Sequence, residues 1–177
     1  VIYQFIWKDY CDWYIEFIKP ILNSNNNNLS LNETRFVSIN VMQNVLLMLH
    51  PIMPYITEEI FEKLFKSPKL VIKSSWPNLM FGNLDLSNSI DLSIKIISEI
   101  RSLRVEKNIP VKSFPKLFLK NVNLEKKNFI SNNVELITNL AKLEKIIFSD
   151  DEKLIENHII STVDEITLMI PLEGLIN

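Results

Sequence analysis

The stretch HPIMPYITEEIFEKL, residues 50–64, decides the course of the chain on both sides of it. Pro51 and Pro54 lack an amide donor and crowd the preceding turn, so they end a helix predicted over residues 33–50. Proline also suits the first position of a helix, and a second, short helix is therefore expected from near Pro54 to near Phe65. The stretch predicts a sharp break between two helices.

Apolar side chains recur at helical spacing both upstream and downstream of this break. Residues 1–22 predict a helix that is apolar over most of its circumference, which indicates contact with more than one neighbour. The asparagine run at 25–28 is typical of a solvated loop. A longer helix is predicted over residues 87–107, with Asp85 or Ser87 as its cap.

The pattern changes after Pro110, where short apolar runs alternate with a single helical pattern. The expected elements are strands over 116–121, 158–163 and 166–170, the last two as a hairpin, a helix over 124–141, and a short apolar segment over 144–149. We therefore predict a mainly α fold: an antiparallel helical bundle over residues 1–110, followed by a small α/β subdomain over residues 111–177.

Composition narrows the range of functions. The chain has a net charge of −2, so any contact with RNA must come from a local basic patch. With two glycines in 177 residues, it lacks the clustered glycines of phosphate-binding loops. One cysteine excludes an intrachain disulfide and fits a cytoplasmic protein, and no apolar run approaches the ~20 residues that cross a membrane.

Residues suited to catalysis or metal binding are isolated from one another. His50 and His158 have no ligand partners at metal-binding spacing, and His50, at a helix end, is typical of a local structural residue. Cys11 lies between aromatic side chains and is expected to be a buried small hydrophobe. Glu58 and Glu59 point about 100° apart on a helix and do not converge. We expect no catalytic residue and no metal site.

Three aromatic side chains on the first helix, Trp7, Trp13 and Tyr14, have ring faces on which RNA bases stack. Because this helix is apolar around most of its surface, we expect these rings to pack inside the protein instead.

Basic side chains at the end of the 87–107 helix are the candidate RNA contacts. Arg101 and Arg104 continue the face that carries Ile90, Ile94 and Ile97, whereas solvated arginines ordinarily lie opposite such a face. Two interpretations remain open: the arginines pair with bundle carboxylates such as Glu58 or Glu59, or they meet RNA phosphate in a groove. Lys107 and Lys112 extend the positive charge, and the RNA-binding candidates are Arg101, Arg104 and Lys107.

Five strings, in this order, resemble the anticodon-binding C-terminal region of class I aminoacyl-tRNA synthetases, above all the valyl branch. They are DYCDWYIE at 9–16, HPIMPYITEE at 50–59, SWP at 75–77, IRSLRVEKNIP at 100–110 and IPLEGLIN at 170–177. Tyr55 stands where the family more often has Phe, which is a mild departure.

The resemblance implies a tRNA-anticodon-binding bundle that is not itself catalytic. The family's HIGH and KMSKS motifs do not occur here, so a parent chain would supply the ATP and Mg²⁺ chemistry that couples valine to tRNA. The resemblance also places the first bundle helix before residue 1 and a coiled coil after residue 177. The expected partner is valine-specific tRNA, bound by a cytoplasmic monomer, with no DNA, membrane or resident cofactor. Two alternatives remain: a helical protein-interaction module, or the same domain of an isoleucyl or leucyl synthetase.

Overall fold

The computed structural model folds as two compact units, Val1–Phe81 and Gly82–Asn177, termed the first and second unit. It describes residues 1–23, 29–66, 69–78, 82–149 and 158–171; the predicted loop at 25–28 and most of the string at 170–177 lie outside them. The boundary between the two units, after Phe81, falls earlier than the predicted boundary at 110/111, because the long helix α5 packs with the elements that follow it. The predicted domains, residues 1–110 and 111–177, stay a prediction.

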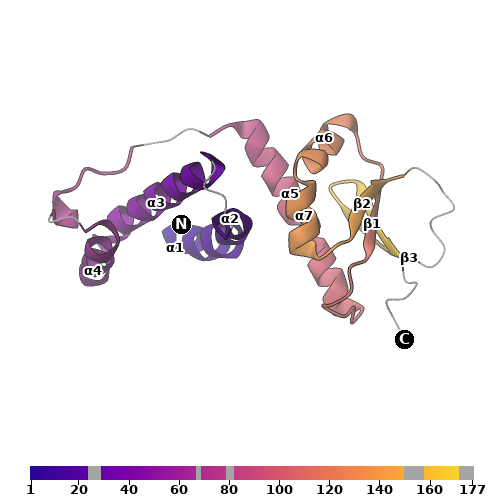
Figure 1. Cartoon of the computed structure of the whole chain (residues 1–177), viewed down its shortest axis with the longest axis horizontal. Helices are drawn as coiled ribbons and strands as arrows, with labels where there is room; N and C mark the ends of the chain where they lie inside the picture. Colours follow the sequence, from indigo (N-terminus) through magenta and orange to yellow (C-terminus); the bar gives the residue numbers. More distant parts are fainter. Residues whose placement is uncertain (24–28, 67–68, 79–81, 150–157, 172–177) are drawn as a thin grey trace. The chain divides into compact units, whose positions relative to one another are not determined.

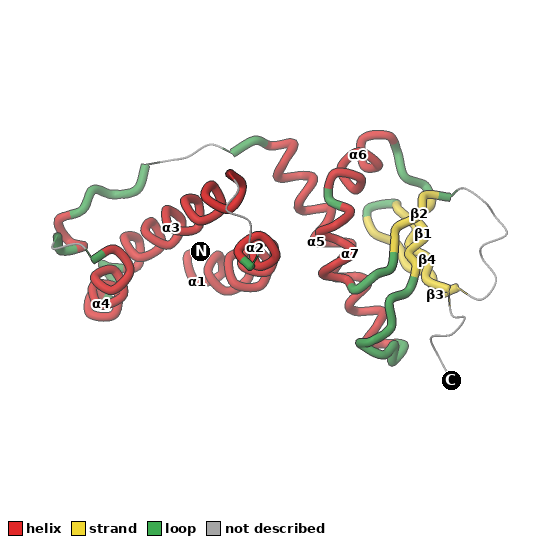
Figure 2. Tube along the Cα trace, viewed as in Figure 1, coloured by secondary structure: helices red, strands yellow, loops and turns green. Residues whose placement is uncertain are grey.

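The first unit begins with a continuous helical segment, as predicted, but its winding is not uniform. A short α1 (Ile2–Gln4) leads into η1 (Phe5–Tyr14), which winds as a π-helix, and then into α2 (Ile15–Leu22) (Figure 2). The Ile15 N–H bonds to the Tyr10 carbonyl, five residues back. Hydrophobic spacing reports which side chains share a face, not which carbonyl accepts, so it did not predict the wider turns.

Helix α3 (Leu29–Leu49) packs against α2 and against α4 (Pro54–Phe65). The prediction that α3 begins at residue 33 was wrong by one turn, because Leu31, only 2% exposed, draws that turn into the core. Helix α4 begins and ends as predicted, with Pro54 in its first turn and Lys66 ending it in the left-handed conformation. Both helices contribute to the apolar cluster of Leu46, Leu47, Phe61 and Val71.

The break between α3 and α4 is held by side chains of the 50–64 stretch. The buried Thr57 hydroxyl lies 2.8 Å from the Met53 carbonyl oxygen and 2.8 Å from His50 Nδ1. The carboxylate of the adjacent Glu58 accepts from the Val71 N–H, at 3.0 and 3.1 Å. Val71 opens the short 3-10 helix η2 (Val71–Lys73), so the stretch fixes both the helix break and the segment that follows.

The second unit is built on α5 (Leu84–Glu106). The prediction that Asp85 or Ser87 caps this helix was wrong. Asn83 caps it instead, since its side-chain oxygen accepts from the Asp85 N–H at 2.9 Å and the Leu86 N–H at 3.4 Å, which starts the helix about one turn earlier. The buried face of α5 includes Ile96, Ile97 and Ile100, all fully buried.

A four-stranded mixed sheet completes the second unit, in the order β2-β1-β4-β3. Strand β1 pairs parallel with β2 and antiparallel with β4, and β4 pairs antiparallel with β3. The strands are β1 (Lys116–Lys120), β2 (Lys145–Phe148), β3 (His158–Val163) and β4 (Ile166–Pro171). The predicted hairpin is confirmed, and its two turn residues, Asp164 and Glu165, have φ of 43° and 72°, as tight two-residue turns require.

The helix predicted over 124–141 is divided into α6 (Leu124–Asn132) and α7 (Val134–Ala141). The division falls at Asn133, whose amide nitrogen donates to Ser89 Oγ at 2.7 Å and to the Phe129 carbonyl at 2.9 Å. Helices α5, α6 and α7 gather on one side of the sheet (Figure 1). The result is a mainly helical chain with one small mixed sheet.

Candidate nucleic-acid interface

The end of α5 places Arg101 and Arg104 one turn apart, facing the end of α7. Arg104 continues the buried face of α5, whereas Arg101 is exposed. Both reach backbone carbonyls at the end of α7, where the last turn of a helix leaves carbonyls without helical partners. The two arginines nevertheless have different surroundings.

Arg104 is buried, with 8% of its surface exposed, and its guanidinium binds backbone oxygens. Nη2 donates to the carbonyls of Pro110 at 2.8 Å and Ser113 at 2.9 Å, and Nη1 donates to Lys142 at 3.3 Å. Burial lowers the pKa of this guanidinium from its ordinary value, although arginine remains charged in proteins. Arg104 thus joins the end of α5 to two other segments. Its partners in the protein are backbone carbonyls, and not the carboxylates or the RNA phosphate considered from the sequence.

Arg101 is exposed, yet it is also oriented by the protein. Its Nε and Nη2 donate to the Leu140 carbonyl at 3.3 and 3.2 Å. Leu140 lies in the last turn of α7, where carbonyls lack helical partners and a positive charge is favoured. The Leu140 carbonyl therefore orients the guanidinium of Arg101 at the surface.

Lysines surround this arginine pair. Lys107 caps the end of α5 and forms an exposed ion pair with Glu106 at 2.7 Å. Because Arg104 binds the carbonyls of Ser113 and Lys142, the exposed Lys112 and Lys142 also belong to this end of the unit. We call Arg101, Lys107, Lys112 and Lys142 the basic corner. Lys142 was not among the predicted residues, because it is 38 positions from Arg104 in sequence.

The bundle carboxylates that were predicted as possible arginine partners have contacts within the first unit. Glu58 accepts from the Val71 N–H, and Glu59 pairs with Lys63 at 2.7 Å. The exposed Glu59 has a pKa below its ordinary value, because it accepts a hydrogen bond from Lys63 and lies beside that positive charge.

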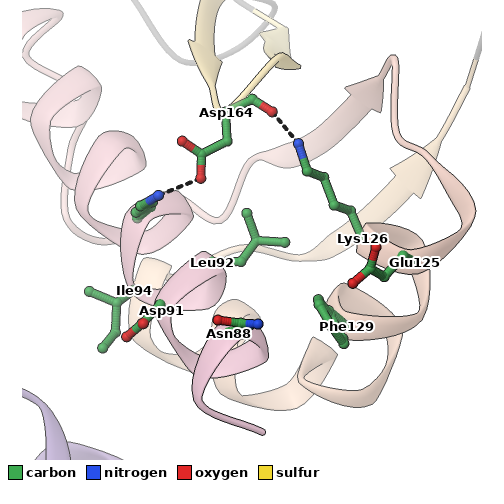
Figure 3. A pocket seen from close by; sticks show the side chains of 9 residues that line it. Asn88, Asp91, Leu92, Ile94, Glu125, Lys126, Phe129 and Asp164 are labelled. Atoms are coloured by element: carbon green, nitrogen blue, oxygen red, sulfur yellow. Dashed lines mark hydrogen bonds and ion pairs between the residues drawn. The ribbon is translucent and has the colours of Figure 1, made fainter. Parts of the chain in front are cut away.

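A hollow of about 470 Å³ in the second unit lies between α5, α6 and the β3–β4 turn. Lys126 donates to the Asp164 carbonyl, and Lys95 pairs with the Asp164 carboxylate (Figure 3). Both lysines are thus engaged by the turn. Asp91 and Glu125 add carboxylates to the lining, so this hollow repels phosphate. It does not suit a nucleic acid.

The aromatic side chains of the first helical segment depart from expectation at one position. Trp7 is 62% exposed and stacks on Tyr3, with ring centroids 6.5 Å apart, so the prediction that it packs inside was wrong. Trp13 and Tyr14 are half-buried, as is Cys11. The segment is apolar around most of its circumference, and the other helices of the unit cover only part of that surface, which leaves Trp7 exposed.

Metal binding and membrane crossing can be assessed for the described parts of the chain. Within them, no three His, Cys, Asp or Glu side chains lie close enough to hold a metal ion. None of the described helices is both long and apolar enough to cross a membrane.

Comparison with known proteins gives a consistent picture. Residues 1–119 match the family model described as the anticodon-binding domain of tRNA ligase. The valine–tRNA ligase of Zymomonas mobilis is 37% identical over 180 residues, covering 99% of this chain and 20% of that protein. Those of Legionella pneumophila (strain Lens) and Staphylococcus aureus (strain JH9) are 33% and 31% identical, again covering 99% of this chain and 20% of each protein. The chain spans about a fifth of the length of these curated relatives.

Proposed function

Because this chain belongs to the anticodon-binding domain family of tRNA ligases, we propose that it binds the anticodon stem-loop of a tRNA. The family match over residues 1–119 is the single observation that carries the proposal. The relatives are named valine–tRNA ligases, so we propose tRNA(Val) as the RNA. We further propose that a parent enzyme, of which this chain is the tRNA-binding part, attaches valine to that tRNA in the cytoplasm with ATP and Mg²⁺.

The same membership supports the finer fold proposal, an antiparallel bundle of the class I synthetase type over residues 1–110. Its helices α2, α3 and α4 pack in sequence, α2 on α3 and α3 on α4. A bundle of this kind holds RNA-contacting side chains at fixed positions, which is how a protein positions a stem-loop without acting on it chemically.

The basic corner supplies the electrostatic part of the proposal. Arg101 is exposed and oriented by the Leu140 carbonyl, and an exposed guanidinium matches the geometry of a phosphate. Lys107 adds a second exposed charge, paired with Glu106. Arg104 remains an RNA-binding candidate, but its burial and its three carbonyl partners favour a positioning role: it holds the corner together while Arg101 and Lys107 contact RNA.

The test measures binding of a tRNA(Val) transcript over a range of salt concentrations. Each phosphate contact removed lowers the salt slope by about 1, so Arg101→Ala and Lys107→Ala are each expected to weaken binding several-fold and to flatten the slope by about that amount. Lys63→Ala is the matched control, because Lys63 is also exposed and paired with a neighbouring glutamate at 2.7 Å.

Unchanged affinity and slope in both variants would rule out the contact role of the basic corner. Failure of the unaltered chain to bind tRNA at low salt, together with capture of a protein partner that persists at high salt, would instead favour an interaction module.

A further inference from the structure

The first unit has a hollow of about 410 Å³ between α3 and the segment that follows α4. One wall is a row of amides on α3, Asn40, Gln43 and Asn44. The other wall is formed by the chain around Trp76, with Lys69 beside it. The described lining contains this one lysine and no carboxylate. Its chemistry is thus polar, mostly uncharged and slightly positive.

The amide row results from helical spacing. The adjacent Gln43 and Asn44 each lie three or four residues from Asn40 and from the buried Leu47, so the four share one face of α3. The Asn40 amide nitrogen donates to the Phe36 carbonyl at 2.8 Å, which leaves its oxygen as an acceptor. Within the described residues, the side chains of Gln43 and Asn44 have no hydrogen-bond partner, although both are half-buried. Donors and acceptors are therefore presented to the hollow.

Trp76 is 64% exposed, although the chain leading to it is firmly anchored. Val71 is 2% exposed and its N–H binds the Glu58 carboxylate, and the Ser74 N–H bonds to the Val71 carbonyl at 2.8 Å. A second, smaller hollow of about 140 Å³, beside His50, is also lined by Trp76. The indole thus borders two hollows and has ring surface left uncovered by its own unit.

We propose that this hollow holds one unpaired nucleotide of a bound RNA, with its base stacked on Trp76. The proposal rests on the proposed function, in that the RNA is the tRNA bound by this chain. Single-stranded bases are recognised by stacking on aromatic rings and by hydrogen bonds to their edges, and amide side chains carry the donor and acceptor that those edges need.

The hollow in the second unit differs from the amide-lined hollow in the charge of its lining. It has a similar volume, about 470 Å³, but Asp91, Glu125 and Asp164 line it and its lysines are engaged by the hairpin turn. A nucleotide phosphate there would meet carboxylates. The amide-lined hollow combines the indole ring with uncharged amides, and its described lining contains no carboxylate.

The experiment combines a protein variant with loop substitutions in the RNA. A tRNA(Val) transcript is prepared with a single abasic site at each anticodon-loop position in turn. Binding of each transcript is measured for the 177-residue chain and for Trp76→Ala. We expect Trp76→Ala to weaken binding of the intact transcript about tenfold, the scale of one base–aromatic stack. At one loop position, the abasic site and Trp76→Ala together are expected to reduce the binding affinity no more than either change does alone.

Two further variants refine the result. Trp76→Phe keeps a stacking face and is expected to restore most of the affinity. Tyr55→Ala is the aromatic control, because Tyr55 is 91% exposed in the same unit and lies outside the hollow. Gln43→Ala and Asn44→Ala are expected to weaken binding several-fold with no change in the salt slope, since amides do not neutralise phosphate.

The possible outcomes separate the two proposals. If the chain binds tRNA and Trp76→Ala binds equally well, or if its loss adds fully to every abasic site, the nucleotide site is wrong and the proposed function stands. If the unaltered chain binds no tRNA, both proposals fail. Non-additivity at a single loop position, with rescue by Trp76→Phe, supports the site and identifies the base.

Discussion

The end of α5 in the second unit and the outer face of α3 in the first use their polar side chains in different ways. At the end of α5, Arg104 is bound by three backbone carbonyls and is almost fully buried. On α3, the amides of Gln43 and Asn44 have no partner within the described residues, and Trp76 beside them is largely exposed. Thus the charged Arg104 is less accessible to a ligand than the uncharged side chains of Gln43, Asn44 and Trp76.

This difference separates two uses of polar groups. A buried guanidinium with satisfied donors organises the protein, because leaving its carbonyl partners without donors would cost free energy. Polar groups on a helix that have no partner within the protein are suited to a ligand, because no internal hydrogen bond has to be broken when the ligand binds. Substitutions in each region can therefore test whether it behaves as its contacts indicate.

The largest effect is expected from Arg104→Ala. It removes three charge-assisted hydrogen bonds and leaves the carbonyls of Pro110 and Ser113 without those donors, so we expect a loss of about 3 kcal/mol in the free energy of unfolding of the second unit. Hydrogen exchange of the β1 and β4 amides measures it. Arg101→Ala, on the same helix but exposed, is the matched control and is expected to cost less than about 1 kcal/mol. Equal effects of the two substitutions would contradict the distinction drawn between them.

A smaller effect is expected in the first unit from Thr57→Val. This change keeps the shape of the side chain but removes the buried hydroxyl that bonds to the Met53 carbonyl and His50 Nδ1, so we expect a loss of about 1–2 kcal/mol. Because all three tryptophans lie in the first unit, tryptophan fluorescence during urea unfolding follows this change. Thr57→Ser, which keeps the hydroxyl, is expected to lose less; a larger loss would show that packing, not hydrogen bonding, holds the break between α3 and α4.

The smallest effect concerns alkaline pH. Burial raises the pKa of Tyr10, and the nearby Tyr14 and Cys11 raise it further. The folded state therefore holds this proton more tightly than the unfolded state. Its stabilising contribution is complete below the unfolded pKa, near 10, and is lost as the pH rises through the higher folded pKa.

All four tyrosines lie in the first unit, so the second unit should not respond in this way. We expect Tyr10→Phe to reduce the alkaline fall in the unfolding free energy of the first unit, measured by tryptophan fluorescence at several pH values above about 9. An identical fall in Tyr10→Phe and the unaltered chain would show that the phenol is not responsible.

Much of the helical architecture could be predicted from the sequence. Pro54 fixes a first helical turn, so both ends of α4 were correct, and the resemblance to the valyl branch is confirmed by the similarity to valine–tRNA ligases. Boundaries set by single polar side chains were missed: Asn83 caps α5, and Asn133 divides α6 from α7. In both cases an asparagine hydrogen bond outweighed the apolar periodicity.

The candidate site was predicted only in part, because its contacts join residues far apart in sequence. Helical spacing placed Arg101 and Arg104 one turn apart on α5, but only Arg104 is buried, and the carbonyls that it binds lie six to 38 residues away in sequence. Likewise, Trp76 lines the same hollow as Gln43 and Asn44, although it follows them by 32–33 residues in sequence. The roles of Arg101, Arg104 and Lys107 in RNA binding remain predictions.

The most direct test of the central claim is competition for labelled tRNA(Val) bound to the 177-residue chain. One competitor is a hairpin consisting of the anticodon stem and loop alone, and the other is a hairpin of equal length made from the acceptor arm. If the chain binds the anticodon stem-loop, the first hairpin displaces the tRNA and the second does so only at much higher concentration. Equal displacement by the two hairpins, or displacement by the acceptor hairpin alone, would contradict anticodon binding.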